Sequence, residues 1–177
     1  MDLLNRKGLK SGFTIIEVLV VISIIAIVSG IAIPNLIAWL PEYRLRSAAR
    51  DIVSCFQKAK LRAIKENATA VIKFDVVNDK YTAWVDNGGS GTAKNWALDR
   101  NNGEAVLTEN SLPGAVTLYK NTTFASNTFG FNSRGLPAKM VGGSVFINTR
   151  TSNYRKVVVN TAGNIRVQKS SDGTNWE

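Results

Sequence analysis

The sequence contains no histidine and only one cysteine, Cys55, among its 177 residues. Without histidine, the protein has no imidazole base for a catalytic triad and no imidazole ligand for a metal. A single cysteine excludes an intramolecular disulfide, and we expect Cys55 to be a small core residue. Carboxylates paired in a catalytic pattern are also missing. We therefore predict no catalytic residue, no metal site and no cofactor, and we expect that the protein is not an enzyme.

Acidic side chains are scarce relative to basic ones. The chain has 22 Lys and Arg residues against 13 Asp and Glu residues, which gives a net charge of +9. Such a balance suits nucleic acid, anionic lipid or an acidic protein partner and does not choose between them. The apolar residues are concentrated in the first 40 positions. The remainder is rich in polar residues and is long enough to form one domain.

A long uncharged run, Val18–Ile33, lies near the N-terminus. A helix over Phe13–Trp39 would be about 40 Å long, roughly the thickness of a bilayer with its headgroups. A secretory signal peptide has a shorter apolar region without an acid, followed by a small-residue cleavage site. Here Gly12 precedes the run, and Glu17 lies inside its start. A plain membrane anchor fits the length but leaves Glu17 unexplained.

The residues around Gly12 form a specific pattern. A short basic leader ends in Gly12, Phe13 follows, Glu17 is the fifth residue counted from Phe13, and Pro34 is the twenty-second. This pattern resembles the prepilin signature of type IV pilins and type II secretion pseudopilins. The resemblance implies that a prepilin peptidase cuts between Gly12 and Phe13 and that the new Phe13 terminus is N-methylated. It also implies that Glu17 and Pro34 serve assembly, with the apolar segment as membrane anchor and filament core.

The resemblance gives Glu17 a physical purpose. Cleavage after Gly12 would create an amino group on Phe13, a cation at the end of an apolar helix. A charged side chain near mid-bilayer costs a few kcal/mol, and pairing the two charges offsets that cost. The pair can form within one chain across a helical turn, and the resemblance implies that it forms between neighbouring subunits. A glutamate that reaches the membrane surface from a helix end is the simpler alternative.

Further along, two prolines interrupt an otherwise helical pattern. Pro34 cannot donate to the carbonyl of Gly30, so we predict a kink or loosening there. Pro41 predicts a second bend or the start of a new helix. From Glu42 to about Asn67 an apolar stripe with helical spacing predicts a helix that packs on a sheet, with a basic, solvated remainder. The stripe comprises Leu45, Ala48, Ala49, Ile52, Phe56, Ala59 and Ala63.

After Asn67 the pattern changes to short apolar stretches separated by Gly, Asn and Ser, which predicts a mostly antiparallel sheet. A hairpin with Gly163 in its turn is one expected feature. The glycine-rich loop after Asp86 lacks phosphate-loop spacing, and Asp86, Asn87 and Asp99 lack EF-hand spacing. The fold class is α+β. Expected strands lie at 70–77, 80–85, 104–109, 115–120, 128–132, 144–149, 156–160 and 164–169.

Three stretches of the second half, QKAKLRAIKENATAVIKF, FGFNSRGLP and RKVVVNTAGNIRV, resemble the GspH/FimT family of minor pilins and pseudopilins. The resemblance implies a leader over 1–12, a transmembrane and filament-core helix over 13–40, and a pilin-like domain over 41–177. It further implies a structural minor subunit of a type II secretion pseudopilus or a type IV pilus, near the tip, with other pilin subunits, prepilin peptidase and inner-membrane lipid as partners. Lys and Arg counts do not orient the segment, and the resemblance implies a cytoplasmic N-terminus and a periplasmic C-terminal domain.

DNA binding is the alternative function. Some FimT-type pilins capture DNA through a C-terminal G-R-x-R stretch, and the matching positions here, 163–166, read Gly, Asn, Ile and Arg. Arg166 is therefore the candidate contact, although the first arginine of the stretch is replaced. Nearby Lys169, Arg155 and Lys156 compensate in part for the missing charge, because phosphate contacts need charge more than a fixed geometry.

Overall fold

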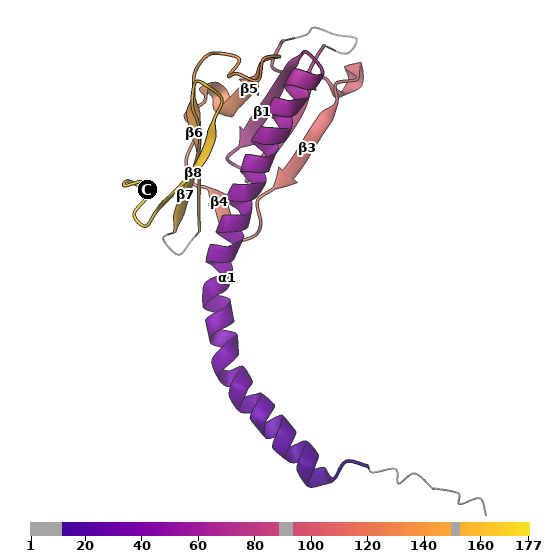
Figure 1. The fold of residues 1–177 in the computed structure, drawn as a ribbon, viewed down its shortest axis with the longest axis vertical. Coiled ribbons are helices and arrows are strands. Elements are labelled where there is room, and N and C mark those ends of the chain that lie inside the picture. The colour runs from indigo at the N-terminus through magenta and orange to yellow at the C-terminus, as the bar shows by residue number, and fades with distance from the viewer. Residues whose placement is uncertain (1–11, 89–93, 150–152) are drawn as a thin grey trace, which may run out of the picture. The chain divides into compact units, whose positions relative to one another are not determined.

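The computed structural model of the protein describes residues 12–88, 94–149 and 153–177, so most of the expected leader lies outside the described residues. The chain divides into two compact units, Met1–Trp39 and Leu40–Glu177. A helix, α1 (Ile15–Lys65), begins in the first unit and ends in the second (Figure 1). Within the described residues, the rest of the second unit consists of eight strands and two short 3-10 helices.

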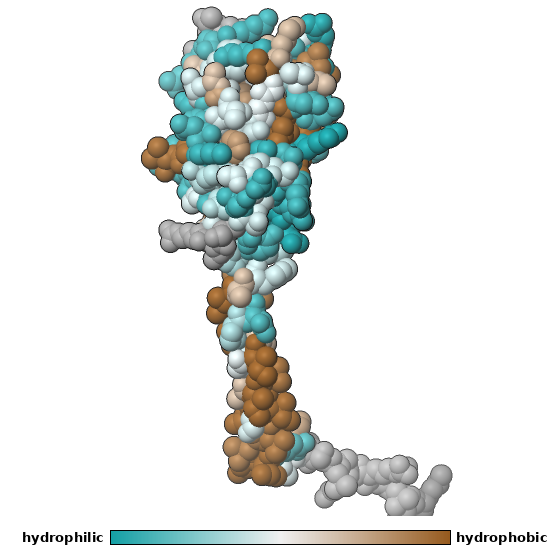
Figure 2. Space-filling view, turned by 90° about the vertical axis from the view of Figure 1, so that its left-hand side faces the viewer, coloured by the Kyte–Doolittle hydropathy of each residue, from teal (hydrophilic) through white to brown (hydrophobic). Residues whose placement is uncertain are grey.

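In the described part of the first unit, residues 12–39, most of the chain is an apolar helix whose large hydrophobic side chains are exposed. Its most apolar 18-residue window has a mean hydropathy of 2.8 and no buried residue. By length and composition, α1 is therefore apolar enough to cross a membrane. Figure 2 shows the hydrophobic surface covering this part of the helix. In water, such a surface is unfavourable, so we expect lipid or other helices to cover it.

Both prolines lie inside α1, which continues through Pro34 and Pro41 without interruption. Of the two alternatives predicted at Pro41, a second bend or the start of a new helix, the second is wrong. Each proline removes one hydrogen bond of the helix ladder, and the turns on either side still close. Next to Pro34, the Asn35 side chain donates to the carbonyl of Ile31 at 3.3 Å.

The strands form two antiparallel four-stranded sheets, where the sequence predicted one sheet. In the first sheet the order is β3 (Val106–Ser111), β2 (Lys80–Asp86), β1 (Thr69–Asp75) and β5 (Thr128–Phe131). In the second the order is β4 (Val116–Leu118), β6 (Gly143–Thr149), β7 (Tyr154–Val159) and β8 (Ile165–Ser170). The 3-10 helices are η1 (Arg100–Asn102) and η2 (Ala125–Asn127). Every expected strand is present.

The predicted hairpin β7–β8 is confirmed, with Gly163 in its turn at φ +73°. A side chain at this position would place its Cβ 2.7 Å from the carbonyl oxygen of Gly135, so glycine is required there. Lys60 of α1 donates to the Gly163 carbonyl at 3.0 Å. The turn is thus attached to the helix.

A single core joins the second half of α1 to both sheets. Every residue of the predicted apolar stripe is buried, and the stripe shares one hydrophobic cluster with Ile72 of the first sheet and Val145 of the second. Phe56 is at the centre, and its ring contacts four other phenylalanine rings at centroid distances of 5.5–6.3 Å: Phe74, Phe124, Phe129 and Phe131. Cys55 is buried as predicted, and burial raises the pKa of its thiol to about 12.

Candidate functional site

The predicted processing and assembly residues lie at the beginning of α1. Phe13 and Glu17 are both exposed. The Thr14 hydroxyl accepts the backbone N–H of Glu17 at 3.2 Å, which makes Thr14 the cap of the helix. Thr-x-x-Glu is the sequence of a capping box, a signal that sequence reasoning missed. Glu17 therefore also has a local role, because an anion in the first turn is favoured by the helix dipole. Pro34 lies further along the same helix and is separate from this group.

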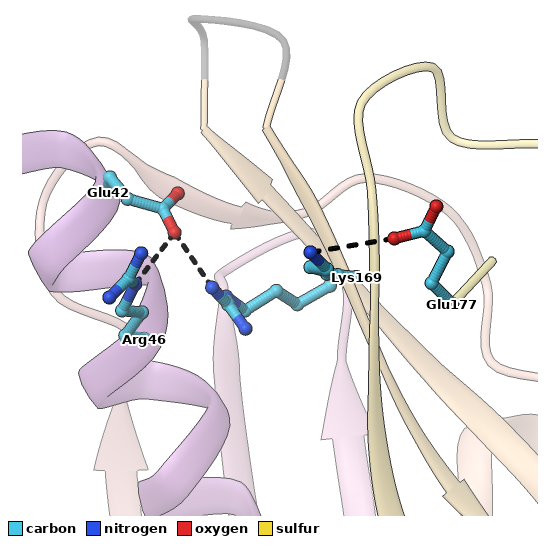
Figure 3. A network of polar contacts seen from close by, with 5 residues as sticks. Glu42, Arg46, Lys169 and Glu177 are labelled. Atoms are coloured by element: carbon cyan, nitrogen blue, oxygen red, sulfur yellow. Dashed lines mark hydrogen bonds and ion pairs between the residues drawn. The ribbon is translucent and has the colours of Figure 1, made fainter. Parts of the chain in front are cut away.

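A second group of polar residues joins α1 to the second sheet (Figure 3). One carboxylate oxygen of Glu42, Oε1, accepts from Arg155 Nη2 at 2.7 Å and from Arg46 Nε at 2.9 Å. Partial burial raises the pKa of the Glu42 carboxyl, but the two arginines outweigh it, and the pKa lies below its ordinary value. Arg155 is only 17% exposed. Arg155, a candidate DNA contact, thus already forms an ion pair with Glu42 of the helix.

The register of β7 and β8 divides the four candidate DNA-binding residues between two faces. Arg155 lies opposite Lys169, whereas Lys156 lies opposite Gln168 and Val158 lies opposite Arg166. Residues directly opposite each other share a face, and neighbours along a strand alternate. Arg155 and Lys169 are therefore on one face, where Lys169 also pairs with Glu177 at 3.5 Å. The structure places Lys156 and Arg166 on the other face.

The face with Lys156 and Arg166 also carries aromatic rings. Tyr119 contacts Phe146 and Tyr154, and Phe146 contacts Trp176. Lys156 Nζ lies 4.5 Å from the Trp176 ring centroid, and Lys120 Nζ lies 4.0 Å from that of Phe146. We call this surface the outer basic–aromatic face; it comprises Lys120, Lys156, Arg166, Tyr119, Phe146, Tyr154 and Trp176.

Positive charge on the outer basic–aromatic face is not neutralised locally. Partial burial and the nearby Lys120 charge both lower the pKa of Lys156. Among the residues that the structure describes, the ion pairs include none of Lys120, Lys156 and Arg166. Lys120 and the four rings were not identified from the sequence, because only tertiary contacts bring them to this face. The arrangement suits a ligand with several negative charges.

Asp86, which the sequence analysis considered as an EF-hand ligand, and Glu104, which it did not single out, have structural tasks. Buried Asp86 accepts the backbone N–H groups of Lys94 at 2.6 Å and Trp96 at 2.9 Å. The carboxylate of buried Glu104 accepts the backbone N–H groups of Gly88 and Asp99. Both carboxylates thereby fix described residues of the segment between β2 and β3. Within the described part of the chain, no group of three or more Cys, Asp or Glu residues is placed to hold a metal ion.

Comparisons with known proteins agree with this architecture. Residues 48–163 match the family described as Type II transport protein GspH, and residues 8–33 match the prokaryotic N-terminal methylation motif. A comparison with curated protein sequences gave no significant match.

Two solved structures illustrate the likeness in fold. The type IV minor pilin FimU of Pseudomonas aeruginosa has a TM-score of 0.56 and 15% identity, over 77% of this chain and 94% of that one. The minor pseudopilin EpsH from the type 2 secretion system of Vibrio cholerae has a TM-score of 0.53 and 14% identity, over 70% of this chain and 95% of that one. At these identities, the likeness establishes the fold alone.

The Glu42–Arg155 pair predicts a pH-dependent contribution to stability. Because the folded-state pKa of Glu42 lies below the ordinary 4.5, the stabilisation is present above pH 4.5 and is lost as the pH falls through the folded-state pKa. We expect Glu42→Gln to lower the free energy of unfolding of the full chain by about 1 kcal/mol at pH 7. At pH 3 the difference from the wild type should be much smaller. Urea unfolding in a non-ionic detergent measures both values.

Glu109→Gln is the matched control. The carboxylate of Glu109 pairs with Arg100 at 2.7 Å, but both side chains are more than half exposed, so solvent screens the pair. We expect this variant to unfold like the wild type at both pH values. A Glu42→Gln effect that is equal at pH 7 and pH 3 would contradict the assignment.

Proposed function

Because the chain belongs to the GspH family, we propose that it is a minor subunit of a type IV filament, either a type II secretion pseudopilus or a type IV pilus. One observation carries the proposal: a methylation motif, an exposed apolar helix and a GspH domain occur in this order in one chain. Other pilin or pseudopilin subunits are then the principal partners. We place the subunit near the filament tip, where it aids assembly.

Processing follows from the same proposal. Prepilin peptidase cuts between Gly12 and Phe13, and the Phe13 amine is methylated. The protein resides in the bacterial inner membrane with its N-terminus in the cytoplasm and residues 41–177 in the periplasm. It then enters a periplasmic pseudopilus or a surface pilus. The match of residues 8–33 to the methylation motif supports this sequence of events.

Assembly requires a new cover for the apolar helix of the first unit. Its large side chains, from Phe13 to Trp39, are exposed, and each buried Å² of apolar surface contributes about 25 cal/mol. Lipid provides the cover before assembly, and helices of neighbouring subunits provide it afterwards. That interaction is strong but does not fix a position along the helix. The ion pair between Glu17 and the Phe13 amine of a neighbour supplies this axial register.

Substitution of Glu17 tests the filament role. Glu17→Ala removes a charge, so the segment should insert into the membrane as the wild type does. We expect its recovery in purified filaments to fall to a small fraction of the wild-type amount, because the neighbour's amine loses its partner. Glu17→Gln retains the capping-box side chain but not the charge, and we expect the same loss. Immunoblots of the membrane and filament fractions from the native host measure the distribution.

Ser23→Ala controls for a general change in helix polarity. The Ser23 hydroxyl donates to the carbonyl of Leu19 in its own helix, at 2.7 Å, so this variant should assemble normally. Mass spectrometry of each mature chain should give a methylated terminus at Phe13. Wild-type incorporation of Glu17→Ala contradicts the charge pairing, and an intact Met1 terminus contradicts the processing. Normal assembly of Glu17→Gln alone would assign Glu17 to capping instead.

DNA binding is the second candidate function, and the outer basic–aromatic face favours it. Among the described residues, Lys120, Lys156 and Arg166 form no ion pair, so their charges are available to phosphates. The partly exposed rings of Tyr119, Tyr154 and Trp176 beside them provide surfaces on which bases stack. The candidates Arg155 and Lys169 lie on the opposite face of the hairpin and are engaged with Glu42 and Glu177. We therefore assign this function to Lys156 and Arg166 rather than to all four residues together.

The salt dependence of binding tests this assignment. Each phosphate contact contributes a slope of about −0.9 to the plot of log affinity against log salt for duplex DNA. We expect the Lys156→Ala, Arg166→Ala double variant to bind more weakly and to flatten the plot by up to about two units. Lys169→Ala removes one charge from the opposite face and should leave the slope unchanged. Fluorescence anisotropy with the full chain in a non-ionic detergent provides the measurement.

Two results would reject DNA as a ligand of this face. The first is an undetectable interaction between the wild-type chain and DNA even at low salt. The second is that Lys169→Ala flattens the salt plot by as much as each substitution in the double variant does. Binding would then depend on the total charge of the protein and not on the position of the charges.

A further inference from the structure

The loop between β2 and β3 holds Trp96 in a strained conformation. Lys94 and Trp96 both have φ +61°, a left-handed conformation that is unfavourable for residues other than glycine. The carboxylate of Asp86, which is 1% exposed, accepts both of their backbone N–H groups and so maintains the strain. Strained backbone conformations that the surrounding structure maintains occur often at functional sites, so the position of the Trp96 side chain is of interest.

The Trp96 ring lies against the face of the first sheet that is turned away from α1. Ala70 and Ile72 contribute to the core with α1, and Val71, which alternates with them, lies opposite Gly130 of β5. A Cβ at position 130 would lie 2.8 Å from Trp96 Cη2, so only glycine lets the ring approach the strand. Lys139 Nζ lies 4.4 Å from the centroid of the same ring.

Trp96 separates two clefts. The smaller, about 200 Å³, is mostly apolar and is lined by Phe124, Phe129 and Val141, with Lys139 at its side. The larger, about 370 Å³, is lined by Trp84 and Thr82, with Lys73 at its side. Among the described residues that line the two clefts, none is acidic. Each cleft thus combines an aromatic wall with one cation.

Trp84 lines the larger cleft, and its indole Nε1 is buried without a hydrogen-bond partner among the described residues. A buried donor without a partner is unfavourable. If the Trp84 ring turned toward the cleft, a ligand that offers a carbonyl or carboxylate oxygen would remove that cost. This observation is independent of the Lys residues and points to a ligand with acceptor groups.

We propose that the two clefts beside Trp96 bind an extended segment of a partner protein in which an apolar side chain is flanked by carboxylates. The apolar side chain occupies the smaller cleft, beside Trp96 and Val141. The carboxylates face Lys139 and Lys73, and the Trp84 ring turns so that a backbone carbonyl of the segment accepts its N–H. The exposed apolar residues Met140 and Val141 extend the surface beside the smaller cleft. This interaction goes beyond the filament role and does not depend on it.

Fluorine NMR of the full chain tests the proposal. The chain has four tryptophans, so 5-fluorotryptophan labelling in a non-ionic detergent gives one signal per residue. Trp96→Phe and Trp84→Phe assign the two signals that matter. The probes are acetyl-Asp-Leu-Asp-amide, its neutral analogue acetyl-Asn-Leu-Asn-amide, and N-acetylleucine as a small acid without a peptide segment. We expect the acidic peptide to shift the signals of Trp96 and Trp84 while those of Trp39 and Trp176 stay in place.

Lys139→Gln and Lys169→Gln form a matched pair of charge variants. We expect the acidic peptide to bind the wild type about two- to fivefold more tightly than its neutral analogue, because a partly screened ion pair adds about this much affinity. Lys139→Gln should reduce this preference, and Lys169→Gln, on the second sheet, should retain it. Because Lys139 is exposed, its substitution should not disturb folding.

Four results would overturn the proposal. The first is the absence of any Trp96 shift with the acidic peptide up to its solubility limit. The second is equal affinity for the two peptides, and the third is binding of N-acetylleucine as tight as that of the acidic peptide, which would indicate a small acid as ligand. The fourth is a Trp96 signal that moves with protein concentration alone, which would make a second copy of this chain the occupant. None of these results bears on Glu17 or on filament assembly.

Discussion

The burial of one stripe of α1 is the interaction on which the globular unit depends. Small residues such as Ala48, Ala59 and Ala63 let the helix lie close to the strands, and Phe56 fills the space between them. The rings around Phe56 come from β1, β5 and the segment before η2, so positions far apart in the sequence meet at one side chain. The second sheet joins the same cluster through Val145, Ile147 and Val157. The clefts beside Trp96 and the outer basic–aromatic face both lie on sheets that this core supports.

The same helix presents two different surfaces along its length. Up to Trp39 its apolar side chains are exposed, whereas from Leu45 to Ala63 they are buried by the chain's own strands. Between these parts, Glu42 connects the helix to β7 through Arg155. A helix with one half covered by its own domain and the other uncovered needs an external apolar environment, which a membrane or a bundle of neighbouring helices supplies. This division gives a physical basis for the proposed role as an anchored filament subunit.

Much of this organisation was predictable from the sequence, because it depends on local periodicity. The helical spacing from Leu45 to Ala63 identified the buried stripe, and short apolar stretches identified the strands. The division into two sheets was not predictable, since it depends on pairings such as β4 with β6, between segments distant in the sequence. The outer face was missed because Lys120 and Trp176 reach it only through tertiary contacts. By contrast, two features follow from local rules and could have been predicted from the sequence. They are the placement of Arg155 and Lys156 on opposite faces of a strand and the capping box that begins at Thr14.

Hydrogen exchange of the full chain in a non-ionic detergent tests most directly whether one helix stripe supports both sheets. Phe56→Ala leaves a cavity at the centre of the core and should destabilise it by about 3–5 kcal/mol. If the core is a single cooperative unit, amide protection should fall by a similar free energy in β1 and β5 of the first sheet and in β6 and β7 of the second. Leu61→Ala, on the exposed side of the same helix, should leave protection unchanged. Loss of protection in the first sheet alone, with the second sheet as protected as in the wild type, would contradict the account.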